Sequence, residues 1–217
     1  EVRVIMTESA QKFISPLLMQ CLTGKPVMTG MWDGDGSGIS HIDLASWGDV
    51  LVVAPATADF ISKLRYGMAD SSLLAVALAS KVPVLVAPAM NVNMYENVAT
   101  QENISILRER GISFVGPDEG DLACGWTGAG RLSEPWEIFY HTRKMLSVHD
   151  FVGKKFLITA GPTREPIDPV RFISNRSSGK MGVSIVREAF CRGGEVTLIH
   201  GPCEIKVPKP TRLVPVT

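Results

Sequence analysis

The stretch Val82-Pro-Val-Leu-Val-Ala-Pro-Ala-Met-Asn91 decides the fold class of this chain. Its apolar part, Val82–Ala87, has the length and composition of a buried strand. Pro88 has no amide hydrogen to donate, so we expect the strand to end there and the chain to turn outward. Asn91, the next polar residue, is then expected at a strand tip, where open α/β sheets bind ligands. Its carboxamide donates and accepts hydrogen bonds, which suits a substrate carboxylate.

Strand-like and helical runs alternate on both sides of this stretch, which is typical of a parallel sheet covered by helices. The expected strands are Val2–Met6, Asp49–Ala54, Val82–Ala87, Ile112–Val115, Lys154–Ala160 and Glu195–Ile199. The expected helices are Ala10–Leu22, Asp59–Tyr66, Ser71–Ser80 capped by Asp70, Gln101–Arg110 capped by Thr100, Ser133 to about Leu146, and Lys180–Cys191. The pattern predicts an α/β protein with a flavodoxin-like or Rossmann-like parallel sheet, followed by the start of a second Rossmann-like domain.

Length and composition set the domain organisation. The 217 residues, 45% of them hydrophobic, can form one large domain or two small ones. We expect a first domain over residues 1–147, a linker over 148–153 and a truncated second domain over 154–217. Both ends fall in strand-like runs and the first residue is not Met, so we interpret the chain as a fragment.

The sequence predicts a cytoplasmic protein. No run approaches the ~18 apolar residues that a membrane span needs, and we find no signal peptide. The four cysteines form no C-x-x-C pair, which argues against disulfides and structural zinc.

Charge divides the chain into an acidic and a basic part. Residues 1–152 hold 11 Lys and Arg against 17 Asp and Glu, whereas residues 153–217 hold 11 against 5. The basic residues stand among glycines without interleaved aromatics, which favours a nucleotide pocket over a nucleic-acid surface. A solvated basic face is the alternative.

Two segments of the first part carry reactive side chains. His41 follows a glycine-rich run, and an imidazole can act as acid or base near neutral pH, although a single histidine is more often structural. Cys124 stands in a loop that holds three glycines and ends at Arg131. We interpret this loop as a mobile lid that carries a thiol, with a buried inert cysteine as the alternative.

Several hydroxyl-bearing residues follow expected strands and suit a phosphate or flavin tail, although helix capping explains them equally well. They are Thr7, Ser9 and Thr57. In the second part, the run Ser177–Lys180 at a helix start offers amides, hydroxyls and a cation to phosphates. The spacing of a P-loop is absent.

Together these segments resemble the bifunctional phosphopantothenoylcysteine decarboxylase / phosphopantothenate–cysteine ligase family of coenzyme A synthesis. The resemblance covers essentially the whole chain. It rests on His41, the runs Ala54–Ala58, Gly67–Asp70, Pro88–Met94 and Ala123–Arg131 of the decarboxylase half, and the run Ala160–Gly182 of the ligase half. The family's first strand and the later nucleotide-binding loop of its ligase domain are missing.

The resemblance implies FMN as the cofactor, CTP and Mg²⁺ for the ligase half, and no resident metal site. The implied catalytic residues are His41, Asn91, Cys124 and Asn175. The implied FMN-binding residues are Thr7, Ser9, Pro55, Ala56, Thr57, Ala58 and Asp70. The implied substrate-binding residues are Ala89, Met90, Asn91, Arg171 and Asn175, and the nucleotide-binding residues are Gly161, Thr163, Asp168, Ser177, Ser178, Gly179 and Lys180.

The reaction implied is the decarboxylation of 4'-phosphopantothenoylcysteine to 4'-phosphopantetheine through a thioaldehyde and an ene-thiolate, because flavin can supply the electron sink that the cysteine lacks. Asn91 would bind the carboxylate, His41 would assist oxidation and Cys124 would donate the final proton. The fused ligase would join 4'-phosphopantothenate and cysteine through an acyl-cytidylate, with Arg171 and Asn175 at that intermediate.

Three alternatives remain. The first is a flavin-dependent decarboxylase of another C-terminal cysteine substrate, and the second is a non-catalytic flavoprotein regulatory subunit. The third, a nicotinamide dehydrogenase, ranks low because no G-x-G-x-x-G follows a strand. The family implies small-molecule substrates, no nucleic acid or membrane partner, and a homo-oligomer that is a trimer through the flavin domain or a dodecamer.

Overall fold

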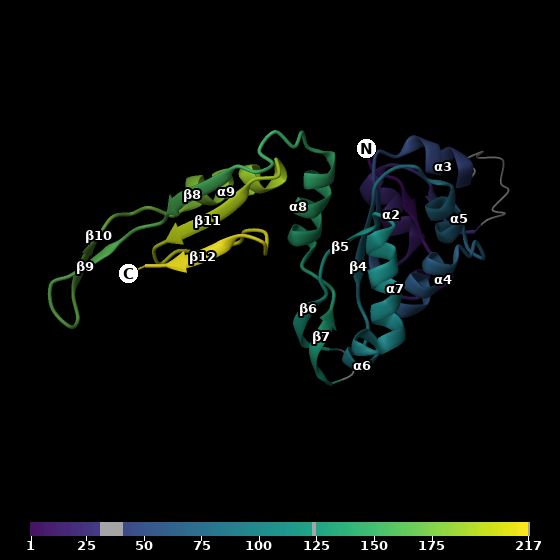
Figure 1. Cartoon of the computed structure of the whole chain (residues 1–217), viewed down its shortest axis with the longest axis horizontal. Helices are drawn as coiled ribbons and strands as arrows, with labels where there is room; N and C mark the ends of the chain where they lie inside the picture. The colour runs from purple at the N-terminus through teal and green to yellow at the C-terminus, as the bar shows by residue number, and fades with distance from the viewer. Residues whose placement is uncertain (31–40, 123–124, 217) are drawn as a thin grey trace. The chain divides into compact units, whose positions relative to one another are not determined.

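The computed structural model describes residues 1–30, 41–122 and 125–216. The chain divides into two compact units, Glu1–Ser133 and Glu134–Thr217 (Figure 1). Helix α8 (Pro135–Leu146) belongs to the second unit, because it packs on α9 (Lys180–Cys191). The rings of His141 and Phe190 pack there edge to face, with their centroids 5.3 Å apart. The division predicted from the sequence, with a first domain over residues 1–147, a linker over 148–153 and a second domain over 154–217, stays a prediction.

A parallel three-stranded sheet forms the centre of the first unit. Its strands lie in the order β3 (Leu51–Ala56), β4 (Val84–Pro88) and β5 (Ser113–Phe114). All five residues of β4 are buried, as expected for a continuous apolar run with sheet neighbours on both sides. Pro88 still pairs with Ala56, so β4 ends one residue later than predicted. The predicted α/β class is confirmed.

The first residues form a separate two-stranded parallel ladder, β1 (Val4–Ile5) with β2 (Val27–Met28). The predicted single helix over Ala10–Leu22 is wrong, because the structure has α1 (Glu8–Gln11) and α2 (Pro16–Thr23). Pro16 has no amide to continue a helix but fits a first turn, and the Ser15 hydroxyl accepts from the Leu17 amide there.

The first unit also contains helices α3 (His41–Trp47), α4 (Ala58–Tyr66), α5 (Ser72–Ala79), α6 (Val92–Glu96) and α7 (Val98–Glu109). Two predicted caps are wrong. Ser71, not Asp70, caps α5, because its hydroxyl accepts from the Leu74 amide. Asn97, not Thr100, caps α7. The core between the sheet and these helices includes the fully buried Ile61, Val86, Ile104 and Leu107.

The glycine-rich segment before α8 is an antiparallel hairpin of β6 (Asp118–Asp121) and β7 (Thr127–Arg131) rather than the predicted loop. Its glycines can adopt the ribbon's backbone and leave room for close approach to neighbouring chain segments. Cys124, in the connection between the two strands, lies outside the described residues.

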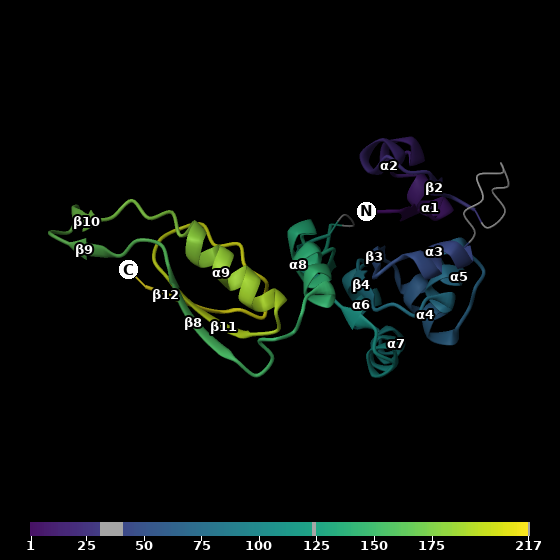
Figure 2. The ribbon, with the colours of Figure 1, turned by 90° about the horizontal axis from the view of Figure 1, so that it is seen from above.

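The second unit has a parallel sheet in the order β12 (Arg212–Pro215), β11 (Glu195–His200) and β8 (Lys155–Ala160). Helix α9 lies across it (Figure 2) and has the predicted bounds. Val186 and Leu198, both fully buried, join the helix to the sheet. A hairpin of β9 (Arg164–Pro166) and β10 (Phe172–Ser174), which the sequence did not predict, is exposed along both strands.

Candidate functional site

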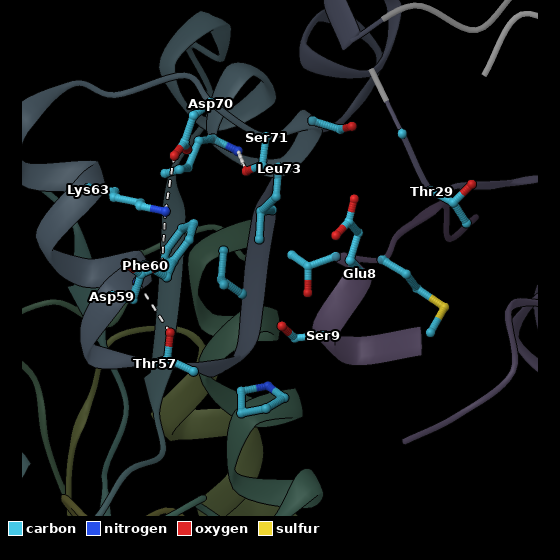
Figure 3. Close-up of a pocket in the computed structure, with 17 residues that line it drawn as sticks. Glu8, Ser9, Thr29, Thr57, Asp59, Phe60, Lys63, Asp70, Ser71 and Leu73 are labelled. Atoms are coloured by element: carbon cyan, nitrogen blue, oxygen red, sulfur yellow. Dashed lines mark hydrogen bonds and ion pairs between the residues drawn. The ribbon is translucent and has the colours of Figure 1, made fainter. Parts of the chain in front are cut away.

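A cavity of about 560 Å³ opens in the first unit, a size typical of small-molecule sites (Figure 3). It is lined by the segments after β1 and β2, the tip of β3, the start of α4 and the start of α5. The lining residues are Met6, Thr7, Glu8, Ser9, Thr29, Gly30, Val53, Pro55, Thr57, Asp59, Phe60, Lys63, Asp70, Ser71, Ser72, Leu73 and Leu74. The cavity therefore lies at the carboxyl ends of parallel strands, where the fold class predicts a ligand.

Short polar side chains at helix starts face this cavity. Thr7 caps α1, with its hydroxyl accepting from the Ala10 amide at 3.2 Å. Thr57 caps α4 in the same way, accepting from Phe60 at 3.2 Å. Both hydroxyl hydrogens stay available as donors. Thr7 and Thr57 therefore both cap helices, which was the alternative to a ligand-binding role. A capping hydroxyl can still donate to a ligand, so the two roles do not exclude each other.

Lys63 carries the positive charge of the cavity wall. Its ammonium lies 3.0 Å from a carboxylate oxygen of Asp70 and 3.2 Å from one of Asp59. Figure 3 draws Lys63 between these two side chains. Hydrogen bonding to Asp70, and next to Asp59, raises the pKa of Lys63 above its ordinary value of 10.5. Lys63 was not among the residues predicted from the sequence. The available signal was the Asp59–Lys63 spacing of four residues on a helix.

This ion pair predicts an alkaline stability change. Because the pKa of Lys63 is raised on folding, its contribution is complete below pH 10.5 and is lost as the pH rises through the folded value. Asp70→Asn should therefore lower the Tm at pH 8, with a difference from wild type that shrinks at alkaline pH. Melting curves across this range test it. Asp59→Asn, at a more exposed carboxylate, is the matched control and should have the smaller effect. An equal or larger Asp59→Asn effect would contradict the assignment.

The structure brings most of the predicted FMN-binding residues together. Thr7, Ser9, Pro55, Thr57 and Asp70 all line the cavity. Ala56 and Ala58 do not line it: Ala56 is fully buried in its pairing with Pro88, and Ala58 is half-buried at the first residue of α4.

The predicted decarboxylase residues lie outside this lining. Asn91 caps α6, with its side-chain oxygen accepting from the Asn93 amide at 2.9 Å. Ala89 donates its amide to Ala56 at 2.9 Å, so the Ala89–Asn91 segment continues from the edge where β3 and β4 end. His41 is half-buried at the first residue of α3. Cys124 is outside the described residues.

A second cavity of about 520 Å³ lies in the second unit, between the end of β8 and the start of α9. Its lining is Thr159, Ala160, Gly161, Arg176, Ser177, Ser178, Gly179, Lys180, Met181 and Gly182. Five of the predicted nucleotide-binding residues are among these, whereas Thr163 and Asp168 are not. Gly182 is needed for the packing of α9 on β8, because a Cβ there would stand 2.6 Å from the Thr159 oxygen.

Asp168, Arg171 and Asn175 belong to the exposed β9–β10 hairpin and the segment after it. The Asp168 carboxylate accepts from the Val170 amide at 2.9 Å and from the Arg171 guanidinium at 2.6 Å. These bonds, the Val170 amide first, lower the pKa of Asp168. Asn175 accepts from the Ser177 amide at 2.9 Å. These interactions fix the loops locally, and none of the three side chains lines a cavity described above.

Two features are absent from the described part of the chain. Residues 1–30, 41–122 and 125–216 hold no cluster of three or more His, Cys, Asp or Glu side chains that could bind a metal ion. None of the helices in these ranges has the length and apolar character of a membrane span.

Comparison with known families gives two matches. A family described as "Flavoprotein" matches residues 1–147, and one described as "DNA/pantothenate metabolism flavoprotein C-terminal domain" matches residues 151–217. The first covers more than half of the chain. The boundary between the two matches falls close to the predicted linker.

Curated relatives match over nearly the whole chain. The coenzyme A biosynthesis bifunctional protein CoaBC of Bacillus subtilis (strain 168) is 49% identical over 212 residues, which are 96% of this chain and 52% of that protein. The protein of the same name from Vibrio cholerae is 46% identical over 208 residues, 95% of this chain and 52% of that protein. The chain thus spans about half the length of the curated relatives that it matches.

Solved structures match the first part. The FMN-dependent cysteine decarboxylase SpaF is 34% identical with a TM-score of 0.57, covering 68% of this chain and 81% of that one. A mutant PPC decarboxylase complexed with pantothenoylaminoethenethiol is 33% identical with a TM-score of 0.57, covering 66% and 81%.

Proposed function

Because this chain belongs to the flavoprotein family, we propose that its first unit binds FMN in the cavity of Figure 3 and decarboxylates 4'-phosphopantothenoylcysteine. The observation that carries the proposal is the convergence of Thr7, Ser9, Pro55, Thr57 and Asp70 on one cavity at the strand tips. Two similar structures support it, because SpaF is an FMN-dependent cysteine decarboxylase and the other protein is a PPC decarboxylase.

The residues of the cavity fit a flavin. Its volume, about 560 Å³, suits a ligand of that size, and the hydroxyls of Thr7 and Thr57 can donate to ribityl or phosphate oxygens. Bound flavin supplies reversible two-electron chemistry, which a cysteine residue losing carbon dioxide requires. The Lys63 ammonium adds a positive charge to a wall that also carries the carboxylates of Glu8, Asp59 and Asp70.

The remaining roles belong to the substrate side. Asn91 binds the carboxylate that leaves as carbon dioxide, and it lies close after β4, whose tip adjoins that of β3. His41 assists the oxidation step and Cys124 returns the proton to the product. The presence of both His41 and Cys124 in the sequence favours an enzyme over a regulatory flavoprotein subunit.

Anaerobic incubation of the FMN-loaded chain with 4'-phosphopantothenoylcysteine tests this function. We expect 4'-phosphopantetheine by mass spectrometry, and little turnover of a peptide that ends in cysteine. Preferential turnover of the peptide would support the alternative substrate class. FMN binding without turnover of either compound would support a regulatory subunit and contradict the proposal.

For the second unit we propose binding of CTP with Mg²⁺ in the cavity lined by Gly161 and the run Ser177–Lys180, as part of a phosphopantothenate–cysteine ligase. The match to the pantothenate-metabolism domain and the two CoaBC relatives support it. The hydroxyls of Ser177 and Ser178 and the Lys180 ammonium suit phosphate oxygens. The acyl-cytidylate would form with Arg171 and Asn175 close to it.

Asn175→Ala should make this acyl-cytidylate accumulate in a protein that carries this chain at the full length of its relatives. The reason is that the amide would assist capture of the intermediate by cysteine, so its loss slows the second step and not the first. Mass spectrometry of quenched reactions measures the intermediate. Ser184→Ala, on the exposed side of α9, is a control and should accumulate none. Equal levels in wild type and Asn175→Ala would contradict the role.

We also propose a cytoplasmic homotrimer through the first unit, with larger assemblies up to a dodecamer in longer proteins. Large apolar side chains exposed on the α1–α2 segment support an interface there: Phe13 is 92% exposed and Leu22 is 73% exposed. Light scattering on the chain tests it. A trimer mass is expected, and a monomer at all concentrations would contradict it.

A further inference from the structure

The hairpin of β6 and β7 meets the Ala89–Asn91 segment through one backbone hydrogen bond. The Met90 amide donates to the Gly130 carbonyl at 3.0 Å. Met90 directly precedes Asn91, whereas Gly130 lies 40 positions further along the chain in β7. This bond therefore ties the predicted carboxylate-binding segment to an element distant in sequence.

An irregularity in the hairpin makes this bond possible. In the ladder Asp118 pairs with Arg131, and the next residue, Glu119, pairs with Ala129. Gly130 thus has no partner residue on β6, as in a β-bulge, and its carbonyl is directed to Met90 instead. Bulges commonly redirect one residue of a strand in this way, and they are frequent beside active sites.

The contact leaves no room for a side chain at Gly130. A Cβ at this position would lie 2.2 Å from the Met90 carbonyl oxygen, which is a backbone atom and cannot move alone. Two residues earlier, a Cβ at Gly128 would meet a Val92 methyl group at 2.8 Å. By contrast, a Cβ at Gly120, on the other strand, would only touch the flexible Arg131 side chain at 3.5 Å.

We propose that Gly130 is a positioning residue that fixes the Ala89–Asn91 backbone, and with it the Asn91 carboxamide, for substrate binding. The substrate part of this inference rests on the proposed decarboxylase function. Gly130 touches no substrate in this role. It acts by allowing the close approach that holds Met90, and through Met90 its neighbour Asn91.

Gly130→Ala tests the backbone part without reference to activity. Amide hydrogen exchange of Met90 should become at least roughly tenfold faster, because its hydrogen bond is lost. The Ala89 amide is an internal reference, since it donates to Ala56 and not to the hairpin. Gly120→Ala is the matched control: Gly120 and Gly130 have similar φ angles, +153° and +158°, so both substitutions carry the same backbone strain and only Gly130→Ala adds the clash with the Met90 backbone. Unchanged Met90 exchange in Gly130→Ala would overturn the proposal.

Steady-state kinetics test the substrate part. We expect a KM for 4'-phosphopantothenoylcysteine raised about tenfold in Gly130→Ala, with the affinity for FMN and the Gly120→Ala kinetics unchanged. Faster Met90 exchange with an unchanged KM would overturn the positioning role. If the wild-type chain decarboxylates nothing, the proposed function fails, and the exchange data alone decide whether Gly130 holds the segment.

A second pair of variants covers the case in which Gly130→Ala does not fold. Gly128→Ala should speed Met90 exchange less, because the clashing atom is the far end of the Val92 side chain. Adding Val92→Ala removes that methyl group and should restore the protection. Failure of Val92→Ala to rescue a defect in Gly128→Ala would contradict the docking of β7 on this segment.

Discussion

Asn91→Asp is expected to lower kcat/KM for decarboxylation by at least about 100-fold while FMN stays bound. The proposed role of Asn91 is to donate a hydrogen bond to the substrate carboxylate. An aspartate at the same position would present a second negative charge at hydrogen-bonding distance, and a like-charge contact of this kind costs several kcal/mol. The loss should appear mainly in KM at pH 8 and lessen toward pH 4, where roughly half of the new carboxyl groups are protonated because the ordinary pKa of aspartate is about 3.9.

The fold should tolerate this change. Asn91 caps α6 by accepting from the Asn93 amide at 2.9 Å, and aspartate caps helices about as well as asparagine. Asn97→Asp is the matched control, because Asn97 caps α7 through the same kind of bond to the Ala99 amide at 3.0 Å. Its kinetics should be those of wild type. A wild-type kcat/KM for Asn91→Asp would mean that Asn91 is only a structural cap.

Ile61→Ala is expected to destabilise the first unit by about 2–5 kcal/mol, the usual cost of emptying a well-packed aliphatic site. Ile61 is 0% exposed and joins α4 to the core formed by Val53, Val86 and Ile104. Urea unfolding followed by far-UV circular dichroism measures the loss. Leu78→Ala, at a side chain 56% exposed on α5, should change the free energy of unfolding by less than about 0.5 kcal/mol.

The test compares the loss in free energy of unfolding between Ile61→Ala and Leu78→Ala. If Leu78→Ala cost as much as Ile61→Ala, the Leu78 side chain would be buried in solution by contacts beyond the single chain. If neither destabilised the unit, the core between the sheet and α4 would be incorrectly described. The FMN-free chain should be used, because a bound ligand raises the apparent stability of both variants.

Elements with strong local signals could be predicted from the sequence. The bounds of α9 were correct, and α4 begins one residue before the prediction, with Gly67 in the left-handed conformation at its end. A prediction failed where a single residue ended a helix within a run of helical sequence. Pro16 divided an apparently continuous helical run into α1 and α2. The strand propensity of the glycine-rich β6–β7 segment is low, and the hairpin contacts a segment distant in sequence, where the Met90 amide donates to the Gly130 carbonyl.

The candidate site could be predicted in part. Strand tips and hydroxyls pointed to Thr7, Ser9 and Thr57, because these positions follow from local structure alone. Lys63 was missed, since its contact with Asp70 depends on how the chain turns between α4 and α5. Nor could the sequence tell that Ala56 faces the core while Pro55 faces the cavity, because this depends on the register with β4.

Amide hydrogen exchange of the chain with and without FMN would test the central claim most directly. The account predicts slower exchange, on FMN binding, in peptides that contain Thr7–Ser9, Thr57–Phe60 and Ser71–Leu74, the amides around the cavity of Figure 3. Peptides from β8 to β12 should not change. Protection confined to the second unit, around Ser177–Gly182, or no protection at a saturating FMN concentration, would contradict a flavin site in this cavity.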